Sequence, residues 1–505
     1  MRQEAEIEAA VRGPRWEPAA WFVLCLGLYV ALAHDAFYKT DGPDIVRLFD
    51  DHLLRGAPLR HPWHVGFLPA LEVFRRALGM FGLQPGYLQL GDWFSAFGAA
   101  LGVAFARAGM RRLSLPAATA RLASLAVALC PGTLLFATVV EFHGPLLGMV
   151  GITFWWTCVQ VARPTWCGFV GLGALAHAAF LIDGQALFLP AWLLSFYLAR
   201  RWGNGARSLD LARAGVAGAV HGALFLALPR LLPGFYGFWA DMQAGLHEEG
   251  AMGTPQSLDW APAIFVQEWL WPLLPVSALV FLAPLRRELR LEFVAFVVGL
   301  LPFLWLSVRL LVFEPEHGAY VLPLVLPAAL LVAQLAGTRW RWPVLLSLLL
   351  GLWPLLGAPR AHLASQAEFD AKFARGVAAA TGAHKPLVLV GSARELAAAY
   401  ARLPADELLW VRLSAAKPRD AQTAVGLQVT AAYLRGLHEA GRAVLITANA
   451  LSSLENPAAA MLAEKPTLQV PANETLEGPL LAQHLRAHFQ LVPAAPDLLR
   501  LVPKP

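Results

Sequence analysis

The stretch DAFYKTDGPDIVRLFDDHLLRGAPLRHP, residues 35–62, decides how the rest of the chain is interpreted. It follows directly on the first strongly apolar run, residues 17–33, and it carries five aspartates: Asp35, Asp41, Asp44, Asp50 and Asp51. Charged groups are costly near hydrocarbon, so aspartates gathered where an apolar helix ends indicate a working loop at a membrane surface. We expect the rest of the chain to hold this loop over a bilayer.

The composition supports a membrane protein. Of the 505 residues 57% are hydrophobic and 15% are charged, against roughly 25% charged in soluble chains, and the mean hydropathy is +0.52. The net charge of +5 comes from arginines at helix ends, so it does not indicate a nucleic-acid partner. The four cysteines lie in or beside apolar segments, which excludes a disulfide framework or a cysteine metal site in the large loops. The first apolar run lacks a small-residue cleavage site, so we expect a permanent helix.

Ten further apolar runs bring the expected number of spans to about eleven. They cover residues 91–108, 120–140, 145–162, 167–183, 184–199, 211–233, 263–284, 291–312, 318–337 and 342–358.

The arginines agree with this number of spans. Alternate connections are basic, with Arg107, Arg111, Arg112, Arg121, Arg163, Arg200, Arg201, Arg207, Arg213, Arg286, Arg287, Arg290, Arg339 and Arg341. The intervening loops read EFHG, IDG, the 234–262 segment and EPEHG, and none contains Lys or Arg. The positive-inside rule therefore predicts a multi-pass protein with a cytoplasmic N-terminus, and we expect a bacterial inner membrane.

The first external loop, residues 35–90, contains two patterns typical of interfacial helices. In the first, Ile45, Leu48, Phe49 and Leu53 recur at helical spacing before Gly56. The second pattern places apolar residues at 71, 74, 78 and 81 opposite charged residues at 72, 75 and 76.

The chain changes character at about residue 359. Strand-like runs at 386–390, 407–413 and 443–448 alternate with helical patterns at 393–402 and 427–440. We therefore expect an α-helical polytopic domain over residues 1–358 and a soluble α/β domain over residues 359–505, with a parallel sheet. With eleven spans this second domain is extracytoplasmic. It lacks the G-x-G-x-x-G spacing of a dinucleotide-binding loop.

Asp41 and Asp44 are the first candidates for chemistry. Both are suited to the N-terminal end of the helix expected from Ile45, one as a cap and the other in the first turn. A carboxylate held there at the membrane rim can also act as a general base that deprotonates an acceptor hydroxyl. The two roles are compatible.

Four further residues have a structural and a functional interpretation. His61 and His64 flank an interfacial Trp anchor, and they are either solvated or in contact with a substrate or metal. No histidine pair at helical spacing supports a zinc site, so a divalent metal stays open. Glu141 and His143 either mark the boundary of a span or serve a function there.

Arg309 lies close to an outer helix end. Its side chain either extends harmlessly to the interface or binds a lipid phosphate, which a guanidinium grips in bidentate fashion.

These residues resemble the GT-C fold family of polyprenyl-phosphate-sugar-dependent membrane glycosyltransferases, above all its protein O-mannosyltransferase-like branch. Residues 17–358 carry the resemblance through four short motifs. They are Asp41-Gly-Pro-Asp44 after the first helix, His61-Pro62 in the first loop, Glu141-Phe142-His143-Gly144 at the outer end of a span, and Tyr320-Val-Leu-Pro323 with Pro327 behind an outer acidic segment.

The resemblance implies that a first-loop carboxylate is the base, and that a sugar leaves a lipid phosphate with inversion on the outer face. Asp41 is then the first candidate and Asp44 the second. Gly-Pro between them departs from the family's Asp-Glu pair and leaves open which one acts. The implied partners are a polyprenyl-phosphate-linked sugar and a protein, lipid or glycan acceptor, with no certain cofactor. The expected substrate-binding residues are His61, Glu141, His143, Arg309, Glu316, His317 and Tyr320.

Two alternatives remain at this point. A lipid transporter is disfavoured because no inverted repeat is seen and the acids lie at the rim rather than at the midplane. A non-catalytic protein of envelope or polysaccharide assembly would present its α/β domain to partners instead.

Overall fold

The structure is a computed structural model. It describes residues 14–34, 36–38, 41–56, 58–59, 61, 64–202, 207–231, 254–255, 262, 265–310, 318–337, 340–381, 386–403, 409–412, 419, 422–464, 468–470 and 472–505.

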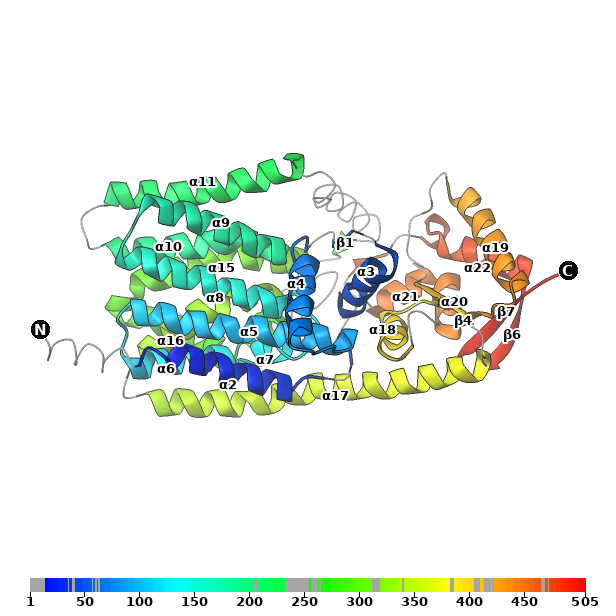
Figure 1. The fold of residues 1–505 in the computed structure, drawn as a ribbon, viewed down its shortest axis with the longest axis horizontal. Coiled ribbons are helices and arrows are strands. Elements are labelled where there is room, and N and C mark those ends of the chain that lie inside the picture. Colours follow the sequence, from blue (N-terminus) through cyan, green and yellow to red (C-terminus); the bar gives the residue numbers. More distant parts are fainter. Residues whose placement is uncertain are drawn as a thin grey trace, which may run out of the picture.

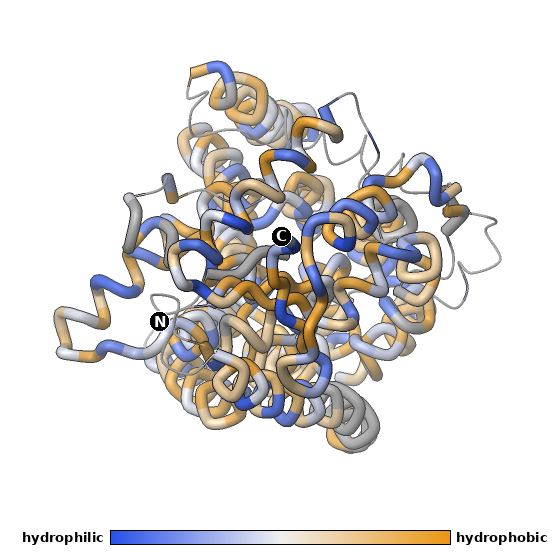
Figure 2. The backbone as a smooth tube through the Cα atoms, turned by 90° about the vertical axis from the view of Figure 1, so that its right-hand side faces the viewer, coloured by the Kyte–Doolittle hydropathy of each residue, from blue (hydrophilic) through white to orange (hydrophobic). Residues whose placement is uncertain are grey.

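The molecule is elongated, with a helical bundle on the N-terminal side and a smaller α/β domain on the C-terminal side (Figure 1). Figure 2 looks along the long axis from the C-terminal end and shows the C-terminus near the centre of the outline. The long elements of the bundle are α2 (Glu17–Ala31), α5 (Tyr87–Arg112), α6 (Ala117–Leu129), α7 (Pro131–Phe136), α8 (His143–Ala162), α9 (Trp166–Ile182), α10 (Leu189–Arg201), α11 (Arg207–Leu231), α15 (Arg290–Leu310), α16 (Val325–Ala336) and α17 (Arg341–Thr381).

Four helical stretches in the described part are long and apolar enough to cross a membrane: Tyr87–Arg112, His143–Ala162, Arg207–Leu228 and Ala319–Ala336. The last combines α16 with the preceding 3-10 helix η6 (Ala319–Leu324). Shorter apolar helices include α2, α6 and α9. The number of spans and the cytoplasmic N-terminus stay predictions.

Two expected spans are interrupted. The run at 120–140 divides at Pro131 into α6 and α7, since proline lacks an N–H and disfavours helical backbone before it. The run at 263–284 breaks into η3 (Phe265–Leu270), α14 (Val276–Leu279) and η4 (Val280–Leu285), with prolines between and within them. A short 3-10 helix, η5 (Arg287–Leu289), follows.

A seam of small residues joins α5 to α8. A Cβ added at Gly102 would lie 2.4 Å from the Leu147 carbonyl oxygen, and one at Gly98 would lie 2.5 Å from the Pro145 Cα. Gly151 is as close to the backbone of α5, 2.3 Å from the Gly102 carbonyl oxygen. Small residues let helix backbones approach closely inside a membrane, so this seam fixes the start of α8 against α5.

The two interfacial helices of the first loop are α3 (Asp41–Arg55) and α4 (Phe67–Met80), which lie where the bundle meets the α/β domain (Figure 1). Helix α3 begins at Asp41 and not at Ile45, so Asp41 belongs to its first turn rather than preceding it. Gly56, with φ +67°, ends it as expected.

The expected faces of α4 need correction. Phe81 follows the helix and is 79% exposed, whereas Glu72 is buried. Arg75 and Arg76 each donate to the Glu72 carboxylate at 2.7 Å, and these bonds, Arg75 first, hold its pKa down to about 2. Two cationic partners make a buried carboxylate tolerable.

The C-terminal domain contains a five-stranded mixed sheet of order β3-β2-β4-β7-β6. Its strands are β2 (Leu387–Val390), β3 (Leu409–Arg412), β4 (Val444–Thr447), β6 (Phe489–Ala495) and β7 (Leu498–Pro503). The parallel set β3-β2-β4 was expected from the sequence, whereas the antiparallel C-terminal hairpin β6-β7 was not. A separate two-residue strand, β1 (Thr254–Pro255), pairs with β5 (Leu468–Gln469) and links the two parts of the chain.

Helices cover both faces of this sheet. The end of α17 and α18 (Ala393–Arg402) form one layer, and α19 (Thr423–Glu439), α20 (Ala448–Glu455) and α22 (Gly478–His488) form the other. Two short helices, α21 (Pro457–Glu464) and η7 (Asn473–Thr475), complete the domain.

Helix α17 runs without interruption through the boundary expected at 358/359. The division into two domains therefore stays a prediction. Helix α18 also contacts α3, where Ala397 joins the cluster of Phe37, Ile45 and Phe49. The α/β domain thus packs directly against the first loop, residues 35–90.

Candidate functional site

The N-terminal end of α3 lies against the segment between α7 and α8. A Cβ added at Gly42 would lie 2.7 Å from the Phe37 ring and 3.0 Å from the Val140 carbonyl oxygen, so a larger residue would force the two segments apart. Gly42 separates Asp41 from the rest of the first turn, and Val140 precedes Glu141. The backbone therefore brings the predicted base residues beside the predicted Glu141 motif, while the side chains of Asp41 and Asp44 lie outside the described residues.

Four side chains form a buried line next to this contact. His143 Nδ1 lies 3.6 Å from Glu141 Oε2, and His143 Nε2 lies 3.6 Å from Asp183 Oδ2. The other oxygen of Asp183 lies 3.9 Å from His64 Nδ1. Glu141 is 1% exposed and Asp183 is 4% exposed. These distances exceed normal hydrogen bonds, so the coupling along the line is electrostatic.

The local sequence positions Glu141 and His143. Helix α7 ends at Phe136 and α8 begins at His143, so Glu141 lies in an irregular link. Ser95 of α5 donates from its hydroxyl to the Glu141 carbonyl at 3.1 Å. Gly144 fits against Ser95, because a Cβ there would lie 2.5 Å from the Ser95 carbonyl oxygen. The link is thereby held to α5.

Asp183 is fixed by its own turn. Its side chain accepts hydrogen bonds from the Gln185 backbone N–H at 3.0 Å and from Gln185 Nε2 at 2.9 Å, at the start of the 3-10 helix η1 (Gly184–Phe188). The segment that carries His61 and His64 contacts the residues just before Asp183. Gly66 N–H donates to the Leu181 carbonyl at 2.7 Å, and His64 Nδ1 lies 3.3 Å from the Ile182 carbonyl oxygen.

Burial disfavours the charged form of the two loop histidines, His61 and His64. Burial holds the pKa of His64 well below its usual range, with His143 as a second cause. Burial likewise lowers the pKa of His61, helped by His64 and Arg47. The Phe142 ring stacks on His64 with centroids 3.4 Å apart, and it also contacts His61 at 5.0 Å. Phe142 is fully buried against His64, and the His61 ring is tilted by 55° to it, so the three rings form an aromatic cluster beside the acids.

Glu141 has an unusual environment for a buried carboxylate. Neither Oε1 nor Oε2 accepts a hydrogen bond from any described residue. Buried polar groups nearly always have partners, and an exception in a native fold calls for an explanation. Glu72, also buried, shows the ordinary solution with its two arginines. Unlike Glu72, Glu141 therefore has both carboxylate oxygens without a hydrogen-bond donor among the described residues.

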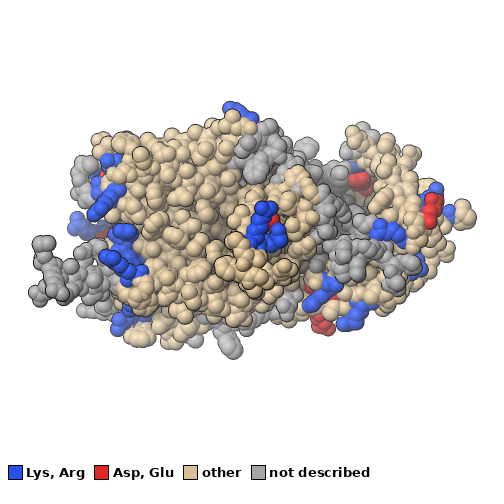
Figure 3. Space-filling view, viewed as in Figure 1, with Lys and Arg blue, Asp and Glu red and all other residues tan. Residues whose placement is uncertain are grey.

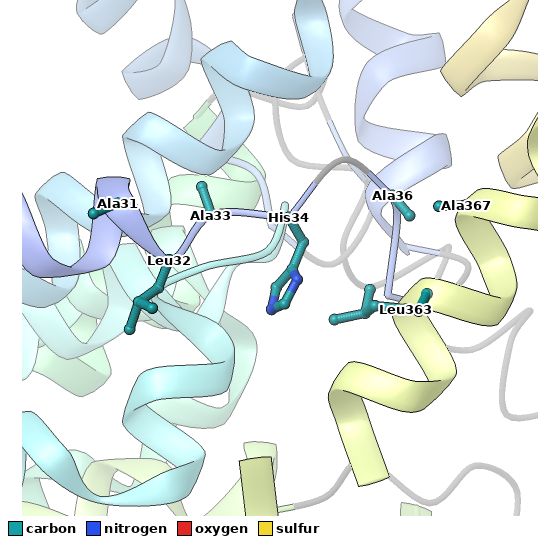
Figure 4. Close-up of a pocket in the computed structure, with 8 residues that line it drawn as sticks. Ala31, Leu32, Ala33, His34, Ala36, Leu363 and Ala367 are labelled. Atoms are coloured by element: carbon teal, nitrogen blue, oxygen red, sulfur yellow. The ribbon is translucent and has the colours of Figure 1, made fainter. Parts of the chain in front are cut away.

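A hollow of about 340 Å³ lies on another side of the loop, between helix α17 and the end of α2 with the residues after it (Figure 4). Its walls are Ala31, Leu32, Ala33, Ala36, Leu363, Ala364 and Ala367, and the His34 ring points into it. The backbone N–H of His34 donates to the Thr138 carbonyl at 3.2 Å. The hollow therefore adjoins the segment that carries Glu141.

The remaining predicted residues are placed less fully. Arg309 lies in the last turn of α15, and its side chain lies outside the described part, as do Glu316 and His317 entirely. Helix α15 contacts η1, which begins directly after Asp183, and it also contacts η6. Tyr320, half-buried, belongs to η6. These placements give no contact between these residues and the buried line of Glu141, His143, Asp183 and His64.

Sequence reasoning missed two acids. Asp183 was noted only as part of an outer loop, although it is the sole charged residue between two apolar runs. Glu268 lies inside an expected span, where one acid in apolar sequence is itself a signal. Its Oε2 accepts the Gly318 N–H at 2.8 Å and so fixes the backbone before η6, where Gly318 has φ +90°.

Whether the protein binds a divalent metal stays open. Among the described side chains, no three His, Cys, Asp or Glu residues are arranged to hold a metal ion.

No family model matches the sequence, and no characterised protein matches it significantly. Two crystal structures of ArnT from Cupriavidus metallidurans, one bound to undecaprenyl phosphate and one in the apo state, are similar to it. Their TM-scores are 0.57 and 0.56, each at 14% identity. The similarity covers 97% and 96% of this chain and 98% of each ArnT chain.

The chain has the fold of ArnT. The GT-C resemblance is thus confirmed at the level of fold. The match extends beyond residues 17–358 and includes most of the α/β domain, which the sequence motifs did not cover.

Proposed function

We propose that the protein is a membrane glycosyltransferase that moves a sugar from a polyprenyl-phosphate donor to an acceptor on the extracytoplasmic face. The ArnT fold supports this, because one of the similar structures holds undecaprenyl phosphate. The observation that carries the proposal is the contact of the α3 start with the Glu141 segment. It gathers acids from distant parts of the chain at one end of the bundle.

In the proposed reaction the bond between the sugar C1 and the phosphate oxygen breaks, and polyprenyl phosphate leaves. The acceptor hydroxyl oxygen forms the new bond to C1 from the opposite side, with inversion. Its proton passes to a carboxylate of the α3 start, with Asp41 first and Asp44 second. An aspartate has an ordinary pKa of about 3.9 and is ionised at neutral pH, as a base must be.

The buried line has a role in holding the sugar. Glu141 and Asp183 accept hydrogen bonds from sugar hydroxyls, and His143 between them keeps the two negative charges compatible. The aromatic cluster of His61, His64 and Phe142 borders this sugar site. Arg309 binds the donor phosphate, and Arg309→Ala should raise the apparent KM for donor more than it lowers kcat.

The surroundings provide routes for both substrates. The hollow beside His34, whose wall side chains are mainly alanine and leucine, suits the first isoprene units of the donor. Helix α18 packs on α3, so the α/β domain borders the loop that an acceptor has to reach.

The test is a transfer assay with the purified full-length protein, a radiolabelled polyprenyl-phosphate sugar and a mixed envelope extract as acceptor. Radioactivity should move to the acceptor fraction with release of polyprenyl phosphate, at a rate proportional to enzyme. Binding of the lipid donor without any transfer would favour a non-catalytic assembly protein. Movement of intact donor between vesicles would favour a transporter.

A further inference from the structure

A second hollow, lined by three arginines, lies at the other end of the bundle. It has a volume of about 550 Å³ and is lined by Arg15, Pro18, Ala108, Arg111, Arg112 and Trp155. Its three charged residues are all cationic. They come from the residue stretch before α2 and from the last turn of α5, while Trp155 comes from α8. Figure 3 shows Lys and Arg side chains gathered at this end of the molecule.

The acids described nearby are already bound by other arginines. Glu17, 6% exposed, accepts from Arg107 at 2.6 Å and from Arg121 at 2.7 Å, so both of its oxygens are occupied. Asp210 is likewise held by Arg201 and Arg213.

The three arginines of the hollow have no carboxylate partner among the described residues. Arg111 donates to the Pro14 carbonyl, which is neutral, and no ion pair is recorded for Arg15 or Arg112. Three guanidinium groups held around one space repel each other unless an anion lies between them. Among the described residues no carboxylate lies between these three groups, so the hollow offers a site for a negatively charged ligand.

The lining also indicates the ligand class. Guanidinium groups bind phosphate oxygens in bidentate fashion. The remaining lining is apolar and includes a half-buried tryptophan, a residue typical of the membrane interface. Basic pockets between the ends of membrane helices are suited to the head groups of anionic lipids.

We propose that Arg15, Arg111 and Arg112 form a binding site for the phosphate of an anionic phospholipid, at the bundle end opposite the α/β domain. The lipid phosphate connects the start of α2 to the end of α5, and an acyl chain lies along the Trp155 side. The site is separate from the proposed sugar-transfer site and does not depend on it.

The test uses the full-length protein in neutral detergent and two triple variants with equal loss of charge. One removes the site (Arg15→Gln, Arg111→Gln, Arg112→Gln). The control removes three exposed arginines from the same end (Arg286→Gln, Arg287→Gln, Arg290→Gln). Native mass spectrometry and thermal shift measure binding of phosphatidylglycerol, with phosphatidylcholine and inorganic phosphate as the other probes.

The wild type should bind phosphatidylglycerol saturably and be stabilised by it. The site variant should bind phosphatidylglycerol on the order of 100-fold more weakly. Each arginine near an anionic head group contributes about fivefold to the affinity, and three are removed. The control should change by less than about threefold. Equal loss in both triple variants would overturn the proposal, because it would indicate diffuse attraction to the whole surface.

Two further outcomes would overturn it. One is unchanged binding in the site variant. The other is displacement of the lipid by inorganic phosphate at equal concentration, which would indicate a soluble phosphate ligand instead. Should the triple variant fail to fold, the single Arg112→Glu variant at an exposed position gives the same comparison and should weaken binding by at least about tenfold.

Discussion

At the scale of single residues, the two buried glutamates of the outer region differ in what surrounds them. Glu72 is satisfied by two arginines, and Glu141 accepts no hydrogen bond from any described residue. Buried carboxylates are normally paired, so the unpaired Glu141 is the better candidate of the two for a substrate contact. The same substitution at both positions therefore separates a structural role from a functional one.

We expect Glu141→Gln to leave the melting temperature nearly unchanged, because neither carboxylate oxygen accepts a hydrogen bond from a described residue that the substitution would break. Sugar transfer should fall about 10- to 100-fold, the value of one charge-assisted hydrogen bond. Glu72→Gln should show the reverse, with stability lower by about 1–3 kcal/mol and transfer near normal. Thermal melts and transfer rates of both variants check this. Equal effects of the two substitutions would contradict the distinction.

Asp370 of α17 gives a pH prediction for the α/β domain. It is fully buried, and burial raises its pKa to about 6 despite the hydrogen bond from Gln366. The fold therefore favours the protonated form. This stabilisation is complete below pH 3.8, the unfolded value, and is lost as the pH rises through about 6.

The loss amounts to about 3 kcal/mol, most of it between pH 4 and pH 7. Amide hydrogen exchange of α18, which packs on α17, measures this loss of stability in the full-length protein. Protection in the wild type relative to Asp370→Asn should fall as the pH rises, and the ratio cancels the intrinsic pH dependence of exchange. A ratio that stays constant from pH 4 to pH 7.5 would disprove the assignment.

At the scale of elements, the α5–α8 seam holds the start of α8, and with it His143. Gly102→Ala should destabilise the protein by about 1–3 kcal/mol, because the new Cβ would lie 2.4 Å from a backbone oxygen that cannot move alone. Gly27→Ala in α2 is the matched control, since nothing lies within 4 Å of its Cβ. It should be neutral or mildly stabilising. The melting temperatures of the two variants in detergent test this prediction. Equal shifts for Gly102→Ala and Gly27→Ala would argue against a special role of the α5–α8 seam.

Local sequence predicted many elements because their determinants are local. Ser392 caps α18 and Gly56 ends α3, and both signals stand in the sequence itself. The breaks at 120–140 and 263–284 were also signalled locally, by prolines, but high hydropathy outweighed them. The hairpin β6-β7 was missed because its two strands depend on pairing with β4 and with each other.

The candidate site was predictable only as a set of residue types. Glu141 and His143 were named from their place at the end of a span, and His61 from the His-Pro pair of the first loop. Nothing local showed that Asp183 would lie between two histidines, because that contact joins residues about 40 and 120 positions apart. Likewise, only packing shows that Glu72 is paired and Glu141 is not.

At the scale of the whole molecule, the account requires the two ends of the bundle to face opposite sides of the membrane. The native Cys167 is exposed at the start of α9, close to the arginine-rich end. Val425 in α19 is 63% exposed in the α/β domain. The two positions are therefore matched reporters for opposite sides.

An impermeant thiol reagent should label Val425→Cys, in a Cys167→Ser background, in intact cells. Cys167 of the wild type should react only after the membrane is opened, because the positive-inside rule places its end in the cytoplasm. The reversed pattern would invert the topology and would remove the extracytoplasmic site from this account. Labelling of both positions in intact cells would instead show that the membranes are leaky.

The central claim is that the start of α3 provides the base for sugar transfer. Its most direct test is the single-turnover rate of transfer from a polyprenyl-phosphate sugar by wild type, Asp41→Asn and Asp44→Asn. Asp41→Asn should lower the rate by roughly 100- to 10,000-fold, with an unchanged melting temperature, and Asp44→Asn should lower it less. The reverse order would move the base to Asp44. Wild-type rates in both variants would contradict the claim that this loop performs the chemistry.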